Sequence, residues 1–187
     1  MTWRTRFLCG TLLTLAACGG SAAGGLSGFG AADTTITCAS GLVWTQGTRE
    51  STLMNPGYAC RSCHLGNNFN GQNPGNAREP QKAYFFMGTA YSTQKEADLC
   101  AADAVPSGAV VEILDTNDVV QLTLDINQAG NFYSNSTTAK VPVPFKARVR
   151  ANGKVNAMAA AQTDGDCNTC HTAGGLNGAP GRITWPQ

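Results

Sequence analysis

The sequence predicts a mainly β protein, an antiparallel β-sandwich flanked by loop-rich segments. Apolar and polar residues alternate along residues 119–126 and 143–151, which is the period of half-buried strands. Residues 115–118 (DTND) and 127–131 (NQAGN) carry turn chemistry beside these runs. Residues 38–82 show no helical period of any length, so a compact helical domain is not expected there.

About five to seven short strands are expected within residues 83–162, which we assign to the sandwich. Residues 108–114 (GAVVEIL) form one strand, and residues 83–91 and 155–161 form outer strands. A further run, Phe132-Tyr133, follows the second turn. The expected core-facing residues of the two alternating runs are Val120, Leu122, Leu124, Ile126, Val143, Phe145, Ala147, Val149 and Ala151.

Residues 1–17 predict an export signal. An apolar run at 7–17 follows two arginines and is too short to span a bilayer. It ends in LAACG at 15–19, which resembles the lipobox of bacterial lipoproteins. The resemblance implies lipidation of Cys18. A glycine follows Cys18, where inner-membrane lipoproteins carry aspartate, and this implies an outer-membrane protein that faces the periplasm or the surface. The alternative is ordinary signal cleavage near the alanines, with Cys18 free.

Residues 18–37 are rich in Gly, Ala and Ser, which predicts a flexible tether between the lipid and the folded part. Removal of the signal takes Arg4 and Arg6 with it, so eleven basic residues face twelve acidic ones. The chain has no basic patch, and we expect no nucleic-acid partner.

One pentapeptide pattern occurs twice, as CRSCH at 60–64 and CNTCH at 167–171. Two cysteines at this spacing can form thioethers to the two vinyl groups of a haem, and the histidine that follows can ligate the iron. The only two histidines of the chain lie in these motifs. We therefore predict two covalently bound haem c groups, in a first haem segment at 38–82 and a second at 163–187. The residues expected to hold them are Cys60, Cys63, His64, Cys167, Cys170 and His171.

Two other interpretations of the cysteine pairs stay open. Two C-x-x-C pairs could form a Cys₄ zinc site. A single pair could instead be a thioredoxin-like redox site, but the βαβ context of such sites is not visible in the sequence.

The remaining cysteines predict a disulfide. Cys9 is lost with the signal, Cys18 carries the lipid, and four cysteines hold haem. Cys38 and Cys100 are left as an even pair in an oxidising compartment, which favours a bond between them over two free thiols.

With both histidines used, the second axial ligands of the irons must come from elsewhere. The candidates are the thioethers of Met54, Met87 and Met158, although methionine is also a common core filler. In the expected strand 155–161 the odd positions are the apolar face, so Met158 should point out of the sandwich core toward the second haem. Met54 could fold over the first haem, and Met87 competes with it. A lysine, or a residue of another subunit, remains an alternative.

The expected sandwich resembles a known module. The runs GTAY at 88–91, PSGAVVEI at 106–113, GNF at 130–132 and PFKARV at 144–149 are similar to carboxypeptidase-regulatory-like, prealbumin-type (Ig-like) sandwiches, which have no catalytic residues of their own. The whole stretch 38–187 resembles exported cytochromes with a C-x-x-C-H motif at either end of an Ig-like domain.

These features predict a dihaem c-type cytochrome that carries single electrons in the cell envelope. We expect an electron carrier more than an enzyme, because no nucleophile or acid–base pair with a placed partner is visible. Its partners would be redox proteins or other cytochromes, together with the membrane. The alternatives are a dihaem peroxidase-like enzyme with an open iron, a haem-based sensor or binding module, and a structural subunit of a cytochrome polymer or complex, including a homo-oligomer.

Overall fold

The computed structural model describes residues 36–47, 51–62, 64, 85–134 and 141–187. All of them belong to one compact unit, residues 33–187. The predicted export signal, Cys18 and Cys63 lie outside the described residues.

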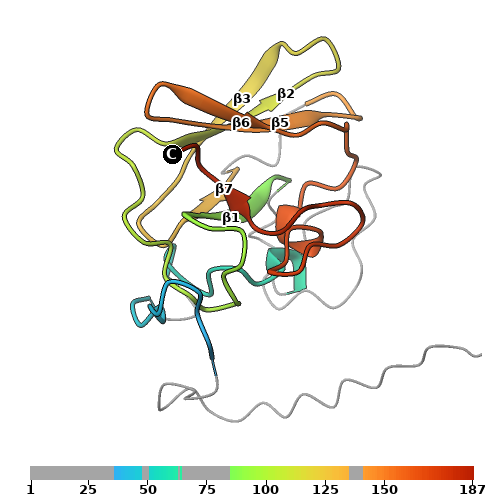
Figure 1. Ribbon diagram of the computed structural model, residues 1–187. Coiled ribbons are helices and arrows are strands. Elements are labelled where there is room, and N and C mark those ends of the chain that lie inside the picture. Colours follow the sequence, from blue (N-terminus) through green and yellow to red (C-terminus); the bar gives the residue numbers. More distant parts are fainter. Residues whose placement is uncertain (1–35, 48–50, 63, 65–84, 135–140) are drawn as a thin grey trace, which may run out of the picture. The chain divides into compact units, whose positions relative to one another are not determined.

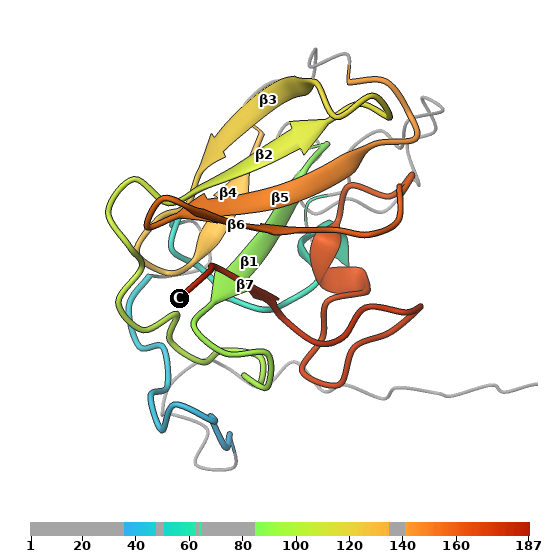
Figure 2. The same ribbon diagram turned by 45° about the horizontal axis from the view of Figure 1, so that its top comes forward.

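The described part of the chain forms seven strands in two sheets, which confirms the predicted mainly β fold (Figures 1 and 2). One sheet has the order β3-β2-β5-β6 and is antiparallel throughout. The other has the order β4-β1-β7, with β1 antiparallel to β4 and parallel to β7. The strands are β1 Met87–Tyr91, β2 Val110–Leu114, β3 Val120–Asp125, β4 Asn131–Tyr133, β5 Lys146–Ala151, β6 Lys154–Ala157 and β7 Ile183–Thr184.

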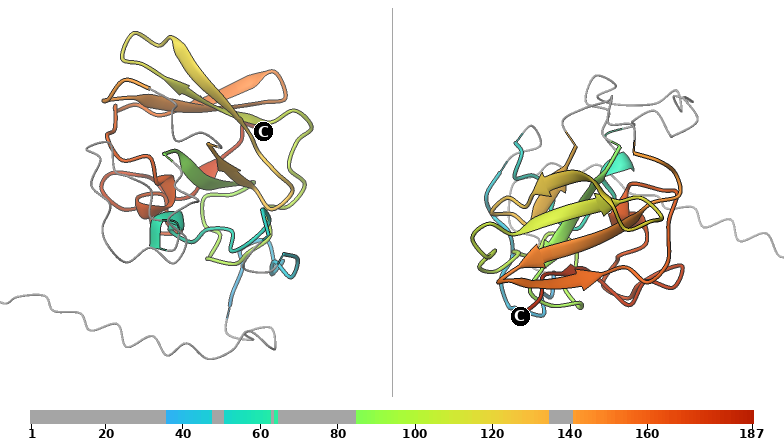
Figure 3. Two further views of the ribbon diagram at one scale, coloured as in Figure 1. Left: turned by 180° about the vertical axis from the view of Figure 1, so that it is seen from behind. Right: turned by 90° about the horizontal axis from the view of Figure 1, so that it is seen from above.

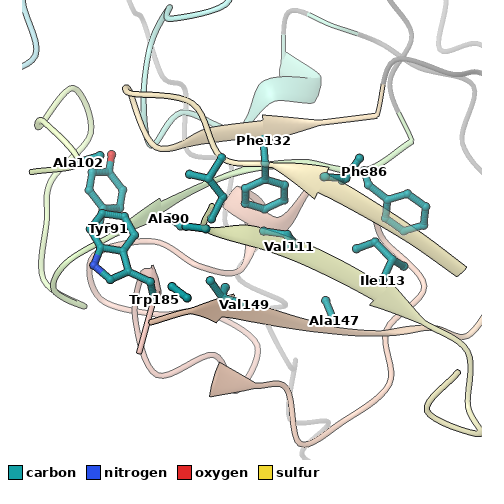
Figure 4. Close-up of a cluster of buried hydrophobic side chains, with 14 of the residues drawn as sticks. Phe86, Ala90, Tyr91, Ala102, Val111, Ile113, Phe132, Ala147, Val149 and Trp185 are labelled. Atoms are coloured by element: carbon teal, nitrogen blue, oxygen red, sulfur yellow. The ribbon is translucent and has the colours of Figure 1, made fainter. Parts of the chain in front are cut away.

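The hydrophobic core lies between the two sheets (Figure 4). Val111 and Ile113 of β2 face inward from the four-stranded sheet, and Ala90 of β1 and Phe132 of β4 face them. Burial of a large apolar side chain contributes about 1.5–3 kcal/mol, so this layer is the main source of stability. Both predicted turns are present, at Asp115–Asp118 and at Asn127–Asn131.

Val120 is a correction to the predicted core. Leu122 and Leu124 face inward as expected, but Val120 is 40% exposed. The register between β2 and β3 shifts at this point, because Ile113 pairs with Leu122 while Leu114 pairs with Val120. The extra residue is a β-bulge, which moves Val120 to the opposite face of the sheet. Val143, predicted to face the core, is also exposed, because it precedes β5 and is not part of a strand; the buried residues begin at Phe145, just before β5.

The edge strand β6 corrects the predicted direction of Met158. Asn152 and Gly153, both with positive φ, form the tight turn between β5 and β6. Val155 is 46% exposed, so the odd positions of β6 do not face the core. Met158 instead packs against the core cluster, on the inner side. The predicted strand 155–161 is shorter in the structure, β6 ends at Ala157, and all four of its residues are exposed because it is an edge strand, so the predicted inward face was wrong.

β1 was predicted as an outer strand, but it is the central strand of its sheet. All five of its residues are buried, because the sandwich core covers one face and residues 54–58 cover the other. The stretch 42–44 runs antiparallel to residues 99–101, and the disulfide between Cys38 and Cys100 joins the same two segments. The structure confirms this predicted disulfide.

Candidate functional site

The described residues of the first C-x-x-C-H motif, 60–62 and 64, adopt the same local structure as their counterparts in the second. The first lies on the 3₁₀ turn η1, Cys60–Ser62, and the second on η3, Cys167–Thr169. The amide of His64 donates to Cys60 O at 2.8 Å, and the amide of His171 donates to Cys167 O at 2.9 Å. Each motif therefore closes into one turn that brings the histidine back beside the first cysteine.

The second motif and the residues just before it are hydrogen-bonded directly to β1. The amide of Met87 donates to Gly165 O at 3.0 Å, and the amide of Thr89 donates to Asn168 Oδ1 at 3.0 Å. A side chain at Gly88 would come within 3.0 Å of Cys167 Cβ and 2.6 Å of the Phe132 ring. Glycine is needed at residue 88 because the cysteine packs against the strand backbone there.

The two motifs are far apart in the sequence and adjacent in the fold (the teal and orange-red turns in Figures 1 and 3). Asn168 Nδ2 donates to Tyr58 O at 2.7 Å and lies 3.9 Å from Cys60 Sγ. The amide of Arg61 donates to Asp166 Oδ2 at 2.7 Å. Residues next to the cysteines of each motif thus contact the other motif directly.

The His171 ring is oriented by the backbone. Its Nδ1 lies 2.8 Å from Gly181 O, and this carbonyl accepts a hydrogen bond from a protonated Nδ1. The proton is then fixed on Nδ1, and Nε2 keeps the lone pair that a metal needs. This is the ligand geometry expected of a metal-binding histidine.

A pocket of about 560 Å³ opens beside the second motif, between that motif and strands β5 and β6. Such a volume lies within the range of about 300–1,000 Å³ found for small-molecule and cofactor sites. Its lining is largely apolar and includes Ala147, Val149, Met158, Cys167, Cys170, His171, Pro180 and Ile183. The second motif and one predicted axial ligand therefore share a pocket.

The three candidate methionines occupy different places. Met158 lines the pocket and is half-buried. Met87 is fully buried and does not line this pocket; it shares a face of β1 with Thr89, which contacts Gly57 just before the first motif. Met54 is half-buried in the stretch that contains Gly57 and precedes the first motif. Its carbonyl accepts a hydrogen bond from Asn131 Nδ2 at 2.8 Å. Met158 is thus brought together with the second motif, Met54 lies in the stretch that precedes the first, and the backbone of Met87 pairs with Gly165 and Asp166 beside the second.

The second motif is a low-polarity environment. Burial, the largest cause, and the nearby carboxylates of Asp166 and Asp164 together raise the pKa of the Cys167 thiol to about 12. Burial also raises the pKa of Asp166, against the opposing hydrogen bond from the Arg61 amide. The surroundings of Cys167 favour an uncharged sulfur.

Arg182 is a functional residue that the sequence did not indicate. Its guanidinium is buried; Nε donates to Glu96 O at 2.8 Å, and Nη2 pairs with Asp98. Nη1 donates to Gly57 O at 2.9 Å and to His171 O at 3.1 Å. One side chain thereby ties the approach to the first motif to the histidine of the second. No local pattern predicts this role, because its partners come from three distant parts of the chain.

Cys38, Glu96 and Cys100 bring three potential ligand atoms within 4.8 Å of one another, the one such group among the described residues. Both sulfurs are joined in the disulfide, and the Glu96 carboxylate already accepts from the amides of Ala39 and Ser40. The oxidised cluster offers no thiolate to a metal, so we treat it as structural.

Within the described ranges, no helix has the length and apolar character needed to cross a bilayer. No protein-family model, curated protein or solved structure matches the chain.

Proposed function

We propose that this protein is a dihaem c-type cytochrome that carries single electrons in the cell envelope and is held at the outer membrane by a lipid on Cys18. One observation carries the proposal: two C-x-x-C-H sequences fold into the same histidine-closed turn and pack against each other. If the cysteine pairs had arisen by chance, there would be no reason for both to form the same turn with a histidine directly after the second cysteine.

The residues of the second motif fit a haem. His171 has Nδ1 on a backbone carbonyl, which leaves Nε2 for iron, and an apolar pocket lies beside the two cysteines. Cys167 and Cys170 would hold one group through thioethers, and Cys60, Cys63 and His64 would hold the other. A bound haem supplies an iron that takes up and releases one electron at a time. The chain itself would ligate the iron, bury the haem and orient it.

Met158 supports a carrier over an open-site enzyme. Its side chain lines the pocket that His171 also lines, so its thioether could serve as a second ligand to an iron held by His171. Ligation by histidine and methionine is typical of electron-transfer cytochromes and raises the reduction potential. It would also close the iron at the second motif to peroxide and other small ligands, which disfavours a peroxidase-like site there.

A Cys₄ zinc site is the second candidate, because the two cysteine pairs belong to adjacent turns. Zinc requires thiolates in a tetrahedral arrangement. Against it, the Asn168 side chain lies between Cys60 and the second turn, and its amide is already bonded on both sides.

Intact mass of the protein, expressed with a c-type cytochrome maturation system, tests the proposal. We expect two covalent haems in the wild-type protein and only one fully attached haem in Cys170→Ala, which removes one thioether position. The matched control is the double variant Cys38→Ala/Cys100→Ala, which removes two cysteines outside the motifs and should retain both haems. A mass without haem, together with stoichiometric zinc, would overturn the proposal in favour of the Cys₄ site.

A further inference from the structure

Asn168 occupies one of the two positions between the cysteines of the second motif, yet it is 2% exposed. Its Oδ1 accepts from the amide of Thr89 at 3.0 Å, and its Nδ2 donates to Tyr58 O at 2.7 Å and to Thr89 Oγ1 at 3.1 Å. A buried amide with partners on both its oxygen and its nitrogen is held in one orientation.

The hydrogen bonds continue from Asn168 into the approach to the first motif. Thr89 Oγ1 accepts from the amide of Gly57 at 2.9 Å and donates to Asn131 Oδ1 at 2.8 Å. Asn131 Nδ2 then donates to Met54 O at 2.8 Å. Residues 54–58, which lead into η1, are thereby tied to β1, to β4 and to the second motif at once.

Two further residues, Arg61 and Arg182, also hold the two turns together. On one side Arg61 pairs with Asp164 at 2.8 Å, in addition to its amide bond to Asp166. On the other side Arg182 donates to the carbonyls of Gly57 and His171. Rotation of one turn against the other would break these buried hydrogen bonds and leave their polar groups without partners, which is energetically costly.

These contacts also bring Cys60 of the first motif close to the second turn. Cys60 Sγ lies 3.9 Å from the Nδ2 of Asn168, and Asn168 directly follows Cys167 in the chain. The Asn168 side chain of the second motif therefore contacts Cys60 of the first motif directly.

We propose that Asn168 is a positioning residue that locks the two haem-attachment turns into one rigid unit, so that the two haems act as an interacting pair and not as independent carriers. The inference rests on the proposed function, because it concerns how the chain holds two haems. It goes further in assigning the relation between them to a buried side chain that neither binds haem nor ligates iron.

Circular dichroism in the Soret region tests this on the holoprotein, because two haems held close at a fixed angle give a bisignate signal. We expect that signal in the wild-type protein, and two separated steps in a redox titration. Asn168→Ala should retain two haems by intact mass, lose most of the bisignate amplitude and reduce the separation of the steps. Asn117→Ala, the same change in an exposed turn, is the matched control and should leave both readouts unchanged.

The outcomes separate the two proposals. Two attached haems without a bisignate wild-type signal would overturn the inference and leave the cytochrome proposal intact. A full signal in folded Asn168→Ala would remove Asn168 from the positioning role. Absence of covalent haem would overturn the proposed function itself. Should Asn168→Ala not fold, the wild-type signal and the distance between the two irons, measured by pulsed electron paramagnetic resonance, still decide whether the haems interact.

Discussion

Met158 lies just beyond β6, where its amide donates to Ala147 O at 2.9 Å and its side chain lines the pocket beside the second motif. The backbone bond fixes the residue to the neighbouring strand, so the thioether is presented from a rigid element. A ligand on a rigid element needs little ordering when a metal binds.

Replacing the sulfur without changing the volume tests this role. Met158→Leu should cost less than about 1.5 kcal/mol in stability, because the two side chains have similar size. We expect it to remove the sulfur-to-iron charge-transfer band of one haem and to open that iron to carbon monoxide, with both haems still attached by mass. Ile183→Leu, which changes another pocket residue without sulfur, serves as the control. An unchanged spectrum in Met158→Leu would show that Met158 is packing and that the ligand lies elsewhere.

At the scale of elements, the buried charged residue Glu112 lies on the outer face of the four-stranded sheet, where β2 pairs with β5. Glu112 stands directly opposite Arg148 and diagonally from Arg150. Its carboxylate accepts from Arg148 Nε at 2.6 Å and from Arg150 Nε at 3.0 Å. Burial raises the pKa of Glu112, but the hydrogen bonds from the two arginines outweigh it, and the pKa is lowered overall.

A lowered pKa makes stability depend on pH in one direction. The charged Glu112 stabilises the fold above the unfolded-state pKa of about 4.3, and this contribution is lost as the pH falls through the lower folded-state pKa. Glu112→Gln should therefore reduce the free energy of unfolding by about 1 kcal/mol at neutral pH, and the difference from wild type should vanish in acid. Urea unfolding at several pH values measures this.

The matched control is Asp118→Asn, the same acid-to-amide change at the exposed ion pair with Lys146. It should cost less than about 0.5 kcal/mol, because exposed pairs are screened by solvent. Equal losses in the two variants would contradict a special role for Glu112.

At the scale of the whole molecule, the proposed anchor would set where the proposed haems act. The described residues belong to the unit 33–187, and the predicted lipid on Cys18 would attach ahead of it. Stable attachment to a bilayer takes more than one acyl chain, which a lipoprotein cysteine supplies.

Membrane partition tests the anchor. Wild-type protein should sediment with membranes, and Cys18→Ser should release it or block its processing. Cys9→Ser is the matched control, because Cys9 would be removed with the export signal, and it should sediment as wild type does. Wild-type protein found in the soluble periplasmic fraction would refute lipidation.

The sequence by itself determined most of the strands, the turns, the haem-type spacing and the disulfide, but not strand β7. The alternation along residues 119–126 and 143–151 is local, because successive side chains of a strand point to opposite faces, although Val120 and Val143 proved to be exposed. The turn at 115–118 is equally local, and Cys38 and Cys100 follow from counting cysteines. Such features depend on neighbours in the chain or on composition, and a single sequence displays both.

Only the tertiary structure decided which faces are buried and which distant residues meet. The bulge that exposes Val120 depends on the register against β2, and the central place of β1 depends on its parallel pairing with β7. The roles of Asn168 and Arg182 depend on hydrogen bonds to distant segments, such as Asn168 to Thr89, 79 residues away, and Arg182 to Gly57, 125 residues away. Long-range pairing leaves no periodic trace in a sequence, because the chain can bring such residues together only after its local elements have formed and packed.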